Sequence, residues 1–594
     1  MTLEEMLEIN RNKFQNYFKE IFTKFLMKID YDAWLIITLS IIIGISGGLF
    51  SVLFRLMIGW SSVGYNGIGE SIFGFLPNNW WKIFVPALAG LVVGPLIYFW
   101  AREAKGHGVP EVMEAAALKG GRMRMRVIFV KAIASASSIG AGASVGREGP
   151  IIQMGSGIGS VAAQWLKLKE DKIKTCVGCG AAAGIAATFN APLAGVIFAQ
   201  EVILNKFTST TFIPIVVSSV TASVIARIFV GDIPAFIVKS YPLNHPLELI
   251  LYTLLGVLAA FISVIFVKML YKSEDIWDEM HFLPEWSRPI FGGLIIGLIG
   301  LKFPQVLGVG YETIEATFNG ELLMVTLFFL VFMKIIATSI TLGSGHSGGV
   351  FAPSLFMGST LGGAFGIFMK QLFPNIVGHP TSYAIAGMGA VVAGATQAPI
   401  TAVLIIFEMT RDYKIMLPLM IAVVFSTLIY SYLNKGSIYT LKLLRRGIDL
   451  KAGRDINIMK QIKVKDVMSC PVEFVRENDK IGNVIKIMHN SKHNGFPVLN
   501  VKDELVGIVT LQDIRVVPVE GIMELPVPKV MSKKLIYTFS EKTLDDVFRI
   551  LNDNDIGHLP VVSPENTKHL IGIITRSDLV KAYDKELISI EDTL

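Results

Sequence analysis

Hydrophobic positions dominate the chain from about residue 34 to about residue 434, and ordinary soluble sequence follows from about residue 440. Stretches such as 34–54 and 249–267 predict membrane helices, since a straight crossing of a bilayer needs about 20 apolar residues. Many stretches are shorter or are broken by Gly and Pro. Broken segments are tolerated in lipid where they line a cavity or are buried in protein, so the pattern favours a permeation pathway over a simple anchor.

Composition and charge support a multi-pass membrane protein. Of 594 residues, 52% are hydrophobic and only 17% are charged, whereas a soluble protein carries about a quarter charged residues. The net charge of +6 is small, and the sequence has no Lys/Arg-rich stretch typical of nucleic-acid binding. The charged segment 1–30 predicts an amphipathic surface helix, not a cleavable signal peptide. The basic junction at 442–454 predicts a cytoplasmic C-terminal end. We expect the N-terminus to be cytoplasmic as well, and the protein to lie in the cell membrane.

The membrane region contains an internal repeat. GREGPIIQMGS (146–156) matches GVFAPSLFMGS (349–359), and NAPLAGVIFAQE (190–201) matches QAPITAVLIIFE (397–408). GHGVPE (106–111) has a looser echo in GVGYE (308–312). Paired, interrupted segments are typical of transporters that bind substrate where two halves meet. We expect an all-α membrane domain over 31–445, with halves at about 31–235 and 236–445.

The tail repeats as well. After a linker at 446–463, residues 464–518 and 527–585 share one pattern, which predicts strand, helix, strand, strand, helix in each. The tail is therefore expected to be a pair of α/β domains.

Three glycine-rich motifs carry the candidate chemistry: GHGVPE, GREGP and GSGHSGGVFAP, each at the edge of an apolar helix. Glycine permits close backbone approach, and a helix N-terminus offers unpaired N–H groups with a positive partial charge. Converging ends would bind a small anion. The alternative is that the glycines serve tight helix crossings, but motifs spread over both repeats favour a site.

Glu148, in the second motif, has no polar surroundings. A charge inside the bilayer costs at least about 2.5–3.5 kcal/mol on insertion scales. The helix ends that attract an anion can also hold this carboxylate, which predicts a gate that competes with the anion and opens on protonation.

These motifs, in this order over about 30–445, resemble the CLC family of chloride channels and proton-coupled chloride exchangers. The resemblance implies an inverted repeat, a homodimer, Glu148 as the gating glutamate and no required cofactor. It places the backbone N–H groups of Val350 and Phe351 and the Tyr439 hydroxyl on the anion. The full predicted anion site comprises His107, Gly108, Val109, Gly146, Arg147, Gly149, Gly349, Val350, Phe351 and Tyr439.

Two positions depart from the family pattern. His107 stands where a serine usually coordinates the anion; it either donates to the anion, more strongly when protonated, or points aside. Val202 stands where many exchangers carry an internal proton glutamate, and favours a channel or weakly coupled conduction. The alternative is an H+/Cl− antiporter. Glu201, which recurs as Glu408, is predicted to be a structural cap or ion pair.

Lys131 and Tyr439 can each be interpreted in a second way. Lys131 matches a buried basic position of the family, or is a lysine whose amine reaches the membrane surface. Tyr439, without the resemblance, reads as an interfacial aromatic anchor.

The tail resembles a pair of cystathionine-β-synthase-type (CBS) domains, which often bind adenine nucleotides. By that resemblance Asp513 and Asp578 would hold ribose hydroxyls, and Thr510 and Thr575 phosphate, of ATP, ADP or AMP. The alternative is a purely structural pair.

Other functions are less well supported. Cys176 and Cys179 form a CxxC, but their apolar surroundings indicate packing, and no metal site is expected. GHSGG around Ser347 fits the nucleophile elbow of serine hydrolases, a pattern that matches often by chance. A magnesium channel would need clustered carboxylates. We therefore expect no enzyme, and chloride as the default anion, with nitrate and fluoride left open by His107.

Overall fold

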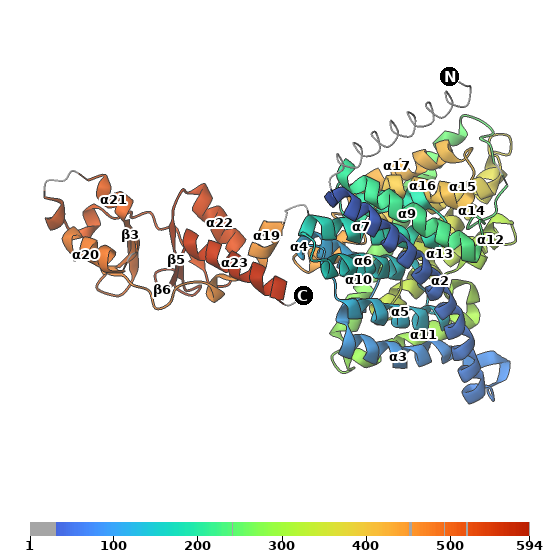
Figure 1. Ribbon diagram of the computed structural model, residues 1–594, viewed down its shortest axis with the longest axis horizontal. Helices are drawn as coiled ribbons and strands as arrows, with labels where there is room; N and C mark the ends of the chain where they lie inside the picture. Colours follow the sequence, from blue (N-terminus) through green and yellow to red (C-terminus); the bar gives the residue numbers. More distant parts are fainter. Residues whose placement is uncertain (1–30, 240, 451–453, 492, 518–520, 593–594) are drawn as a thin grey trace, which may run out of the picture. The chain divides into compact units, whose positions relative to one another are not determined.

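The computed structural model describes residues 31–594 except 240, 451–453, 492, 518–520 and 593–594 (Figure 1). The predicted surface helix at 1–30 and part of the linker lie outside the described residues. The chain divides into two compact units, Met1–Lys442 and Leu443–Leu594, and each is described by itself.

Helices and the turns between them make up the described part of unit 1. They are α2 (Tyr31–Phe73), α3 (Val85–Trp100), α4 (Val109–Leu118), α5 (Met125–Gly140), α6 (Glu148–Trp165), α7 (Glu170–Phe189), α8 (Pro192–Phe198), α9 (Ser209–Val230), α10 (Glu248–Glu279), α11 (Arg288–Lys302), α12 (Tyr311–Phe318), α13 (Met324–Gly343), α14 (Phe351–Leu372), α15 (Pro380–Thr396), α16 (Pro399–Thr410) and α17 (Met416–Leu433). The helix α18 (Thr440–Arg445) follows at the junction with unit 2.

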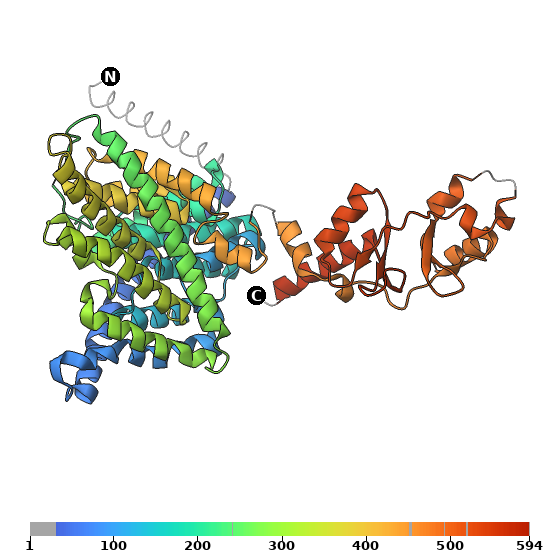
Figure 2. The ribbon, with the colours of Figure 1, turned by 180° about the vertical axis from the view of Figure 1, so that it is seen from behind.

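The helices fall into long and short classes. Among the described residues, seven segments are long and apolar enough to cross a membrane: Asp32–Phe73, Pro77–Trp100, Ser209–Val230, Glu248–Glu279, Met324–Gly343, Phe351–Leu372 and Met416–Leu433. Two shorter apolar segments, Pro192–Ile203 and Pro399–Thr410, lie between them. This mixture confirms the multi-pass membrane domain with broken helices. Figure 2 shows the long α10 running across unit 1, where it packs against α13, α15 and α17.

Each half contains the same helix crossing. The helix α6 packs on α7 in the first half, and α14 packs on α15 in the second. A Cβ on Gly155 would lie 2.2 Å from the Gly180 carbonyl oxygen, and a Cβ on Gly358 would lie 2.3 Å from the Gly387 oxygen. Both crossings therefore need glycine, which lets the backbones approach closely.

Each half also ends its second helix in the same way. Asn190 ends α7 and Gln397 ends α15 in the left-handed conformation, with φ of 57° and 56°. A proline, Pro192 or Pro399, then begins the short helix α8 or α16. Proline is well suited to the first turn because its missing N–H would be unpaired there. The helix α8 continues into a π-helical turn, Ala199–Ile203.

Unit 2 contains two similar α/β domains. The described elements are α19 (Arg454–Gln461), β1 (Val475–Arg476), α20 (Ile481–Ser491), β2 (Gly495–Leu499), β3 (Leu505–Thr510), α21 (Leu511–Arg515), β4 (Thr538–Phe539), α22 (Leu544–Asp553), β5 (His558–Val562), β6 (Leu570–Thr575) and α23 (Arg576–Asp592). The strands form two three-stranded sheets, β1-β2-β3 and β4-β5-β6. In each sheet the first pair is parallel and the second antiparallel. The predicted order of strand, helix, strand, strand, helix is confirmed in both.

Candidate anion pathway and gate

The three glycine motifs meet inside unit 1. The Gly146 N–H donates to the Gly349 carbonyl at 2.8 Å, and the Gly349 N–H donates to the Gly146 carbonyl at 2.6 Å. The Gly348 N–H donates to the Gly106 carbonyl at 3.3 Å. These bonds bring together the segments that start α4, α6 and α14. The convergence of helix N-termini expected from the sequence is therefore present.

Close packing explains several of these glycines. A Cβ on Gly149 would lie 2.3 Å from the His107 carbonyl oxygen, and a Cβ on Gly349 would lie 2.8 Å from the Gly149 nitrogen. Gly108, the residue that caps α4, has a φ of +84°, which side chains rarely adopt. These glycines therefore serve tight packing, as the alternative expected, and the same packing brings the starts of three helices together.

Glu148 is the first residue of α6 and is buried, with 1% of its surface exposed. Its Oε1 accepts a hydrogen bond from the Tyr311 hydroxyl at 2.8 Å. Its Oε2 is buried beside Gly146 and the first turn of α14, where it makes no hydrogen bond of standard geometry with the described residues. The carboxylate therefore lies between two positively polarised helix ends, where an anion is stabilised.

Tyr311 was missed by the sequence analysis. It is the first residue of α12, and the Arg147 guanidinium lies over its ring, 5.3 Å from the centroid. Phe236 packs edge-on against the same ring, with the centroids 5.4 Å apart. In the sequence, Tyr311 belongs to GVGYE (308–312), the loose repeat of GHGVPE, in which it corresponds to Val109. That correspondence does not indicate a contact with Glu148.

His107 and Tyr439 lie together and are both buried, with 0% and 1% of their surfaces exposed. Their ring centroids are 5.8 Å apart. Burial excludes the interfacial-anchor reading of Tyr439. His107 immediately precedes the cap of α4, so its ring lies at the start of one of the converging helices.

The remaining predicted anion-site residues lie at the same helix starts. Val109 is the first residue of α4, Val350 caps α14, and Phe351 is its first residue. All three are buried. The first N–H groups of a helix have no partner within the helix, so the backbone at these positions can donate to an anion.

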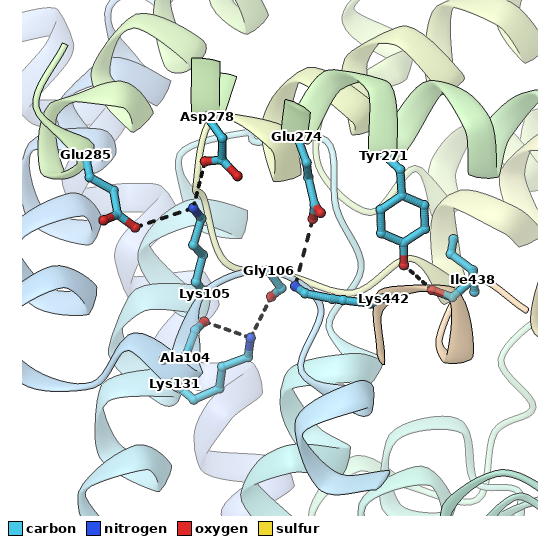
Figure 3. Close-up of polar contacts among 10 residues, drawn as sticks. All are labelled: Ala104, Lys105, Gly106, Lys131, Tyr271, Glu274, Asp278, Glu285, Ile438 and Lys442. Atoms are coloured by element: carbon cyan, nitrogen blue, oxygen red, sulfur yellow. Dashed lines mark hydrogen bonds and ion pairs between the residues drawn. The ribbon is translucent and has the colours of Figure 1, made fainter. Parts of the chain in front are cut away.

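Two buried lysines hold the turns that carry these residues. The Lys131 amine on α5 donates to the Ala104 and Gly106 carbonyls at 3.0 and 2.7 Å, as Figure 3 shows. Lys131 is fully buried and its amine is tied to backbone, so the alternative of an amine reaching the membrane surface is wrong.

Lys334 on α13 does the same in the second half. Its amine donates to the Val306 and Gly308 carbonyls, both at 2.9 Å, and lies 4.9 Å from the Phe356 ring centroid. Positions 131 and 334 differ by 203, the offset that also separates Gly146 from Gly349. Lys334 was not singled out from the sequence, although this offset identifies it.

Further ion pairs surround the turn of Lys131 (Figure 3). The Lys105 amine lies 3.5 Å from carboxylate oxygens of both Asp278 and Glu285. Lys442, on α18, pairs with Glu274 on α10 at 3.8 Å.

The backbone before Tyr439 is also held by α10. The Tyr271 hydroxyl donates to the Ile438 carbonyl (Figure 3). In addition, the Ile438 N–H donates to the Ala395 carbonyl at 2.8 Å. Together these contacts fix Tyr439 at the start of α18.

Glu201 of the first half caps a short helix of the second half, and Glu408 of the second half caps a short helix of the first. Glu201 accepts from the backbone N–H groups of Ile400 and Thr401 at 3.2 and 2.8 Å, at the start of α16. Glu408 accepts from Leu193 and Ala194 at 3.1 and 2.8 Å, at the start of α8. This is the capping role predicted for Glu201. Val202, at the family's proton-glutamate position, is buried in the π-helical turn.

Ser347 does not have the surroundings of a nucleophile. It is buried, and its hydroxyl contacts the Ser135 hydroxyl and the Ala104 carbonyl, both at 2.9 Å. The neighbouring His346 ring contacts Ser138 and the Pro289 carbonyl instead. A serine hydrolase needs a base on its serine, and the described residues provide none.

The two cysteines of the CxxC are buried and unbonded to each other. Among the described residues, no group of three or more His, Cys, Asp or Glu side chains could hold a metal ion.

In unit 2 the predicted nucleotide residues contact each other. The Thr510 hydroxyl donates to Asp513 Oδ2 at 2.7 Å, and the Thr575 hydroxyl donates to Asp578 Oδ2 at 2.7 Å. Each pair lies where a strand turns into a helix and satisfies backbone N–H groups there. Near Asp578, burial and the neighbouring His493 lower the pKa of the His558 imidazole.

Comparison with known proteins identifies the family. The model of the family described as voltage gated chloride channel matches residues 89–431, and the CBS domain model matches 464–520 and 527–585. The chain belongs to the CLC family. Its membrane domain has the CLC fold, and the tail is a CBS pair.

Similar proteins and a similar solved structure also belong to the chloride channels and exchangers by name. The chain is 33% identical over 416 residues to a putative chloride channel protein ClcB-like of Ralstonia nicotianae, covering 69% of this chain and 96% of that protein. It is 32% identical over 448 residues to the H(+)/Cl(−) exchange transporter ClcA of Vibrio cholerae, covering 72% and 95%. A crystal structure of a slow cyanobacterial Cl−/H+ antiporter matches with a TM-score of 0.64 and 28% identity, over 69% of this chain and 97% of that one.

Proposed function

We propose that this CLC protein exchanges chloride for protons, with Glu148 as the group that binds the proton and competes with the anion. The observation that carries the proposal is the position of the Glu148 carboxylate, buried between the N-termini of α6 and α14. Relatives named as exchangers, and the similar antiporter structure, support exchange over the channel favoured by Val202 alone.

The geometry provides a mechanism for competition. When Glu148 is ionised, its carboxylate occupies the region to which the helix ends direct their N–H groups. When Glu148 is protonated, the attraction to those ends falls, the side chain leaves, and an anion takes its place. The anion would then contact the N–H groups of Val350 and Phe351, with His107 and Tyr439 on its other side.

Exchange without a glutamate at Val202 needs another route for the proton. His107 is a titratable group at this position and is buried beside Tyr439. Serine, which the family usually carries there, cannot bind a proton at neutral pH. We therefore propose that His107, beside Tyr439, takes part in moving the proton.

The orientation and assembly belong to the same proposal. The basic residues of 442–454 favour a cytoplasmic unit 2. Glu148 would then face the extracellular solution and Tyr439 the cytoplasm. A homodimer and chloride as the preferred anion follow from the family resemblance.

The CBS pair is proposed as a regulatory module for an adenine nucleotide, with the Thr510–Asp513 and Thr575–Asp578 pairs as contacts. Titration calorimetry of the full chain with ATP, ADP and AMP tests this. Heat with at least one nucleotide, lost on Asp578→Ala, supports the site; no heat with any of them means that the pair is structural.

Exchange is tested by the reversal potential of purified protein in liposomes under a chloride gradient, with and without a pH gradient. Exchange predicts that the pH gradient shifts the reversal potential. A reversal potential that follows chloride alone would show a channel. Glu148→Gln is the matched control, and its reversal potential should ignore pH.

A further inference from the structure

We propose that Tyr311 holds the Glu148 carboxylate in its closed position, so that it sets the external pH at which the gate opens. This inference rests on the proposed function. It assigns a positioning role to a residue on the opposite half of the repeat from Glu148.

The contact is direct and favours the ionised gate. The Tyr311 hydroxyl donates to Glu148 Oε1 at 2.8 Å, while Oε2 has no hydrogen bond of standard geometry among the described residues. A hydrogen bond to a charged acceptor is about twice as strong as one between neutral groups. The bond therefore stabilises the carboxylate more than the carboxylic acid, and opposes protonation and release.

The Tyr311 ring is fixed by its surroundings. Phe236 packs edge-on against it, and the Arg147 guanidinium lies over its face. Beneath it, Lys334 ties the Gly308 carbonyl, three residues before Tyr311, to α13. The hydroxyl is thus aimed at the gate by packing on both halves.

Other charged and titratable groups face this contact, and the test must separate them from Tyr311. Arg147, which caps α6, lies near both partners, and Arg55 of α2 lies near Tyr311 and Arg147. Tyr439 faces Glu148 from the α18 side. Lys334 lies below the turn, and its amine is bound to carbonyls. Removing the Tyr311 hydroxyl also removes its contact with Arg147 and leaves the side chains of the other groups in place.

The experiment measures chloride flux from liposomes as a function of external pH for wild type and Tyr311→Phe. Phenylalanine keeps the ring contacts and removes the hydroxyl, with its bond to Glu148 and its contact with Arg147. We expect half-maximal activation to move to higher pH by about one to two units, from the loss of a hydrogen bond to a charged group. The control is Tyr252→Phe, which removes another buried hydroxyl, bonded to Ser382 at 2.8 Å.

A double variant separates positioning from general damage. In the Glu148→Gln background, Tyr311→Phe should change neither flux nor pH dependence, since the acceptor charge is already gone. An unshifted pH profile in Tyr311→Phe, or the same shift in the Glu148→Gln background, would overturn the role of Tyr311. Failure of the proposed function has a different signature, namely a wild-type reversal potential that ignores pH.

A second measurement covers the case in which Tyr311→Phe does not fold. Replacing tyrosine by 3-fluorotyrosine throughout makes each phenol a stronger hydrogen-bond donor. The activation midpoint of the wild-type sequence should then move to lower pH, opposite to the effect of Tyr311→Phe. No shift, or a shift of the other sign, would contradict the proposal.

Discussion

The turn before α4 and the turn before α12 are built alike and carry different side chains. In each, a buried lysine on the following long helix binds two backbone carbonyls, Lys131 in the first half and Lys334 in the second. The first turn presents His107, which lies against Tyr439, and the second presents Tyr311, which binds Glu148. The scaffold is repeated, whereas the chemistry is not.

The starts of α6 and α14 show the same division. Gly146 and Gly349 bond to each other, and each precedes a helix by two residues. Two positions later the first half has Glu148 and the second has Phe351. One half therefore supplies a carboxylate, the proposed gate, and the other supplies backbone N–H groups and an apolar side chain at the matching position. In the proposed exchange, this asymmetry would let a symmetric frame couple two different ions.

Glu148→Gln should give the largest effect, loss of proton coupling with chloride flux retained, because the amide cannot bind the transported proton. Phe351→Leu, at the repeat-related position, should keep proton coupling. The ratio of proton to chloride flux in liposomes measures both. Glu315→Gln, which removes an exposed carboxylate of α12, is the control. Coupling that survives Glu148→Gln would contradict the asymmetry.

Lys131→Met and Lys334→Met should each lower the free energy of unfolding by about 2–6 kcal/mol, since two buried carbonyls lose their donor. The functional consequences should differ. Lys131→Met should weaken anion binding, through the His107 turn, and Lys334→Met should alter the pH profile, through the Tyr311 turn.

Thermal denaturation in detergent measures the stability change, with the more exposed Lys302→Met as control. Identical functional profiles in the two variants would show that the turns do not serve different ions.

Glu201→Gln and Glu408→Gln should destabilise the protein equally, by about 0.5–2 kcal/mol each, the range for loss of a helix cap. Neither should alter proton coupling, because both carboxylates bind backbone N–H groups of the opposite short helix. Thermal denaturation measures the stability of the two variants, and the ratio of proton to chloride flux measures their coupling. Loss of coupling in Glu201→Gln alone would assign it a proton role.

His107→Ser should have the smallest effect: anion preference changes a few-fold and proton flux slows without being lost, with the fold intact. The serine restores the family's usual donor but removes a titratable ring beside Tyr439. Bi-ionic reversal potentials for chloride against nitrate and fluoride measure the change. Unchanged preference and unchanged pH dependence would place His107 outside the pathway.

The repeat explains how much the sequence could predict. Gly146, Glu148 and Val350 lie within matched, unbroken motifs, and local rules for glycine and helix ends place them correctly. The caps by Glu201 and Glu408 follow from the same repeat. The CBS elements were predictable from strand and helix patterns in each copy.

The contacts of Tyr311 and Lys334 were not predictable. Tyr311 reaches Glu148 across 163 positions of sequence, and its motif is the weakest of the repeated ones. The offset of 203 positions matches Lys334 with Lys131, but it does not show that the Lys334 amine binds the Val306 and Gly308 carbonyls. Val202 by itself favours a channel, whereas relatives named as exchangers favour exchange, because one missing carboxylate does not show whether another group carries protons.

The most direct test of the central claim is proton movement driven by chloride alone. Liposomes loaded with high chloride are diluted into low chloride, with the membrane potential clamped and the interior already more acidic than the bath. If Glu148 couples the two ions, chloride leaving will draw protons inward against their gradient, and Glu148→Gln will not do so. If protons in the wild type move only down their gradient, the protein does not exchange chloride for protons, and the account is wrong.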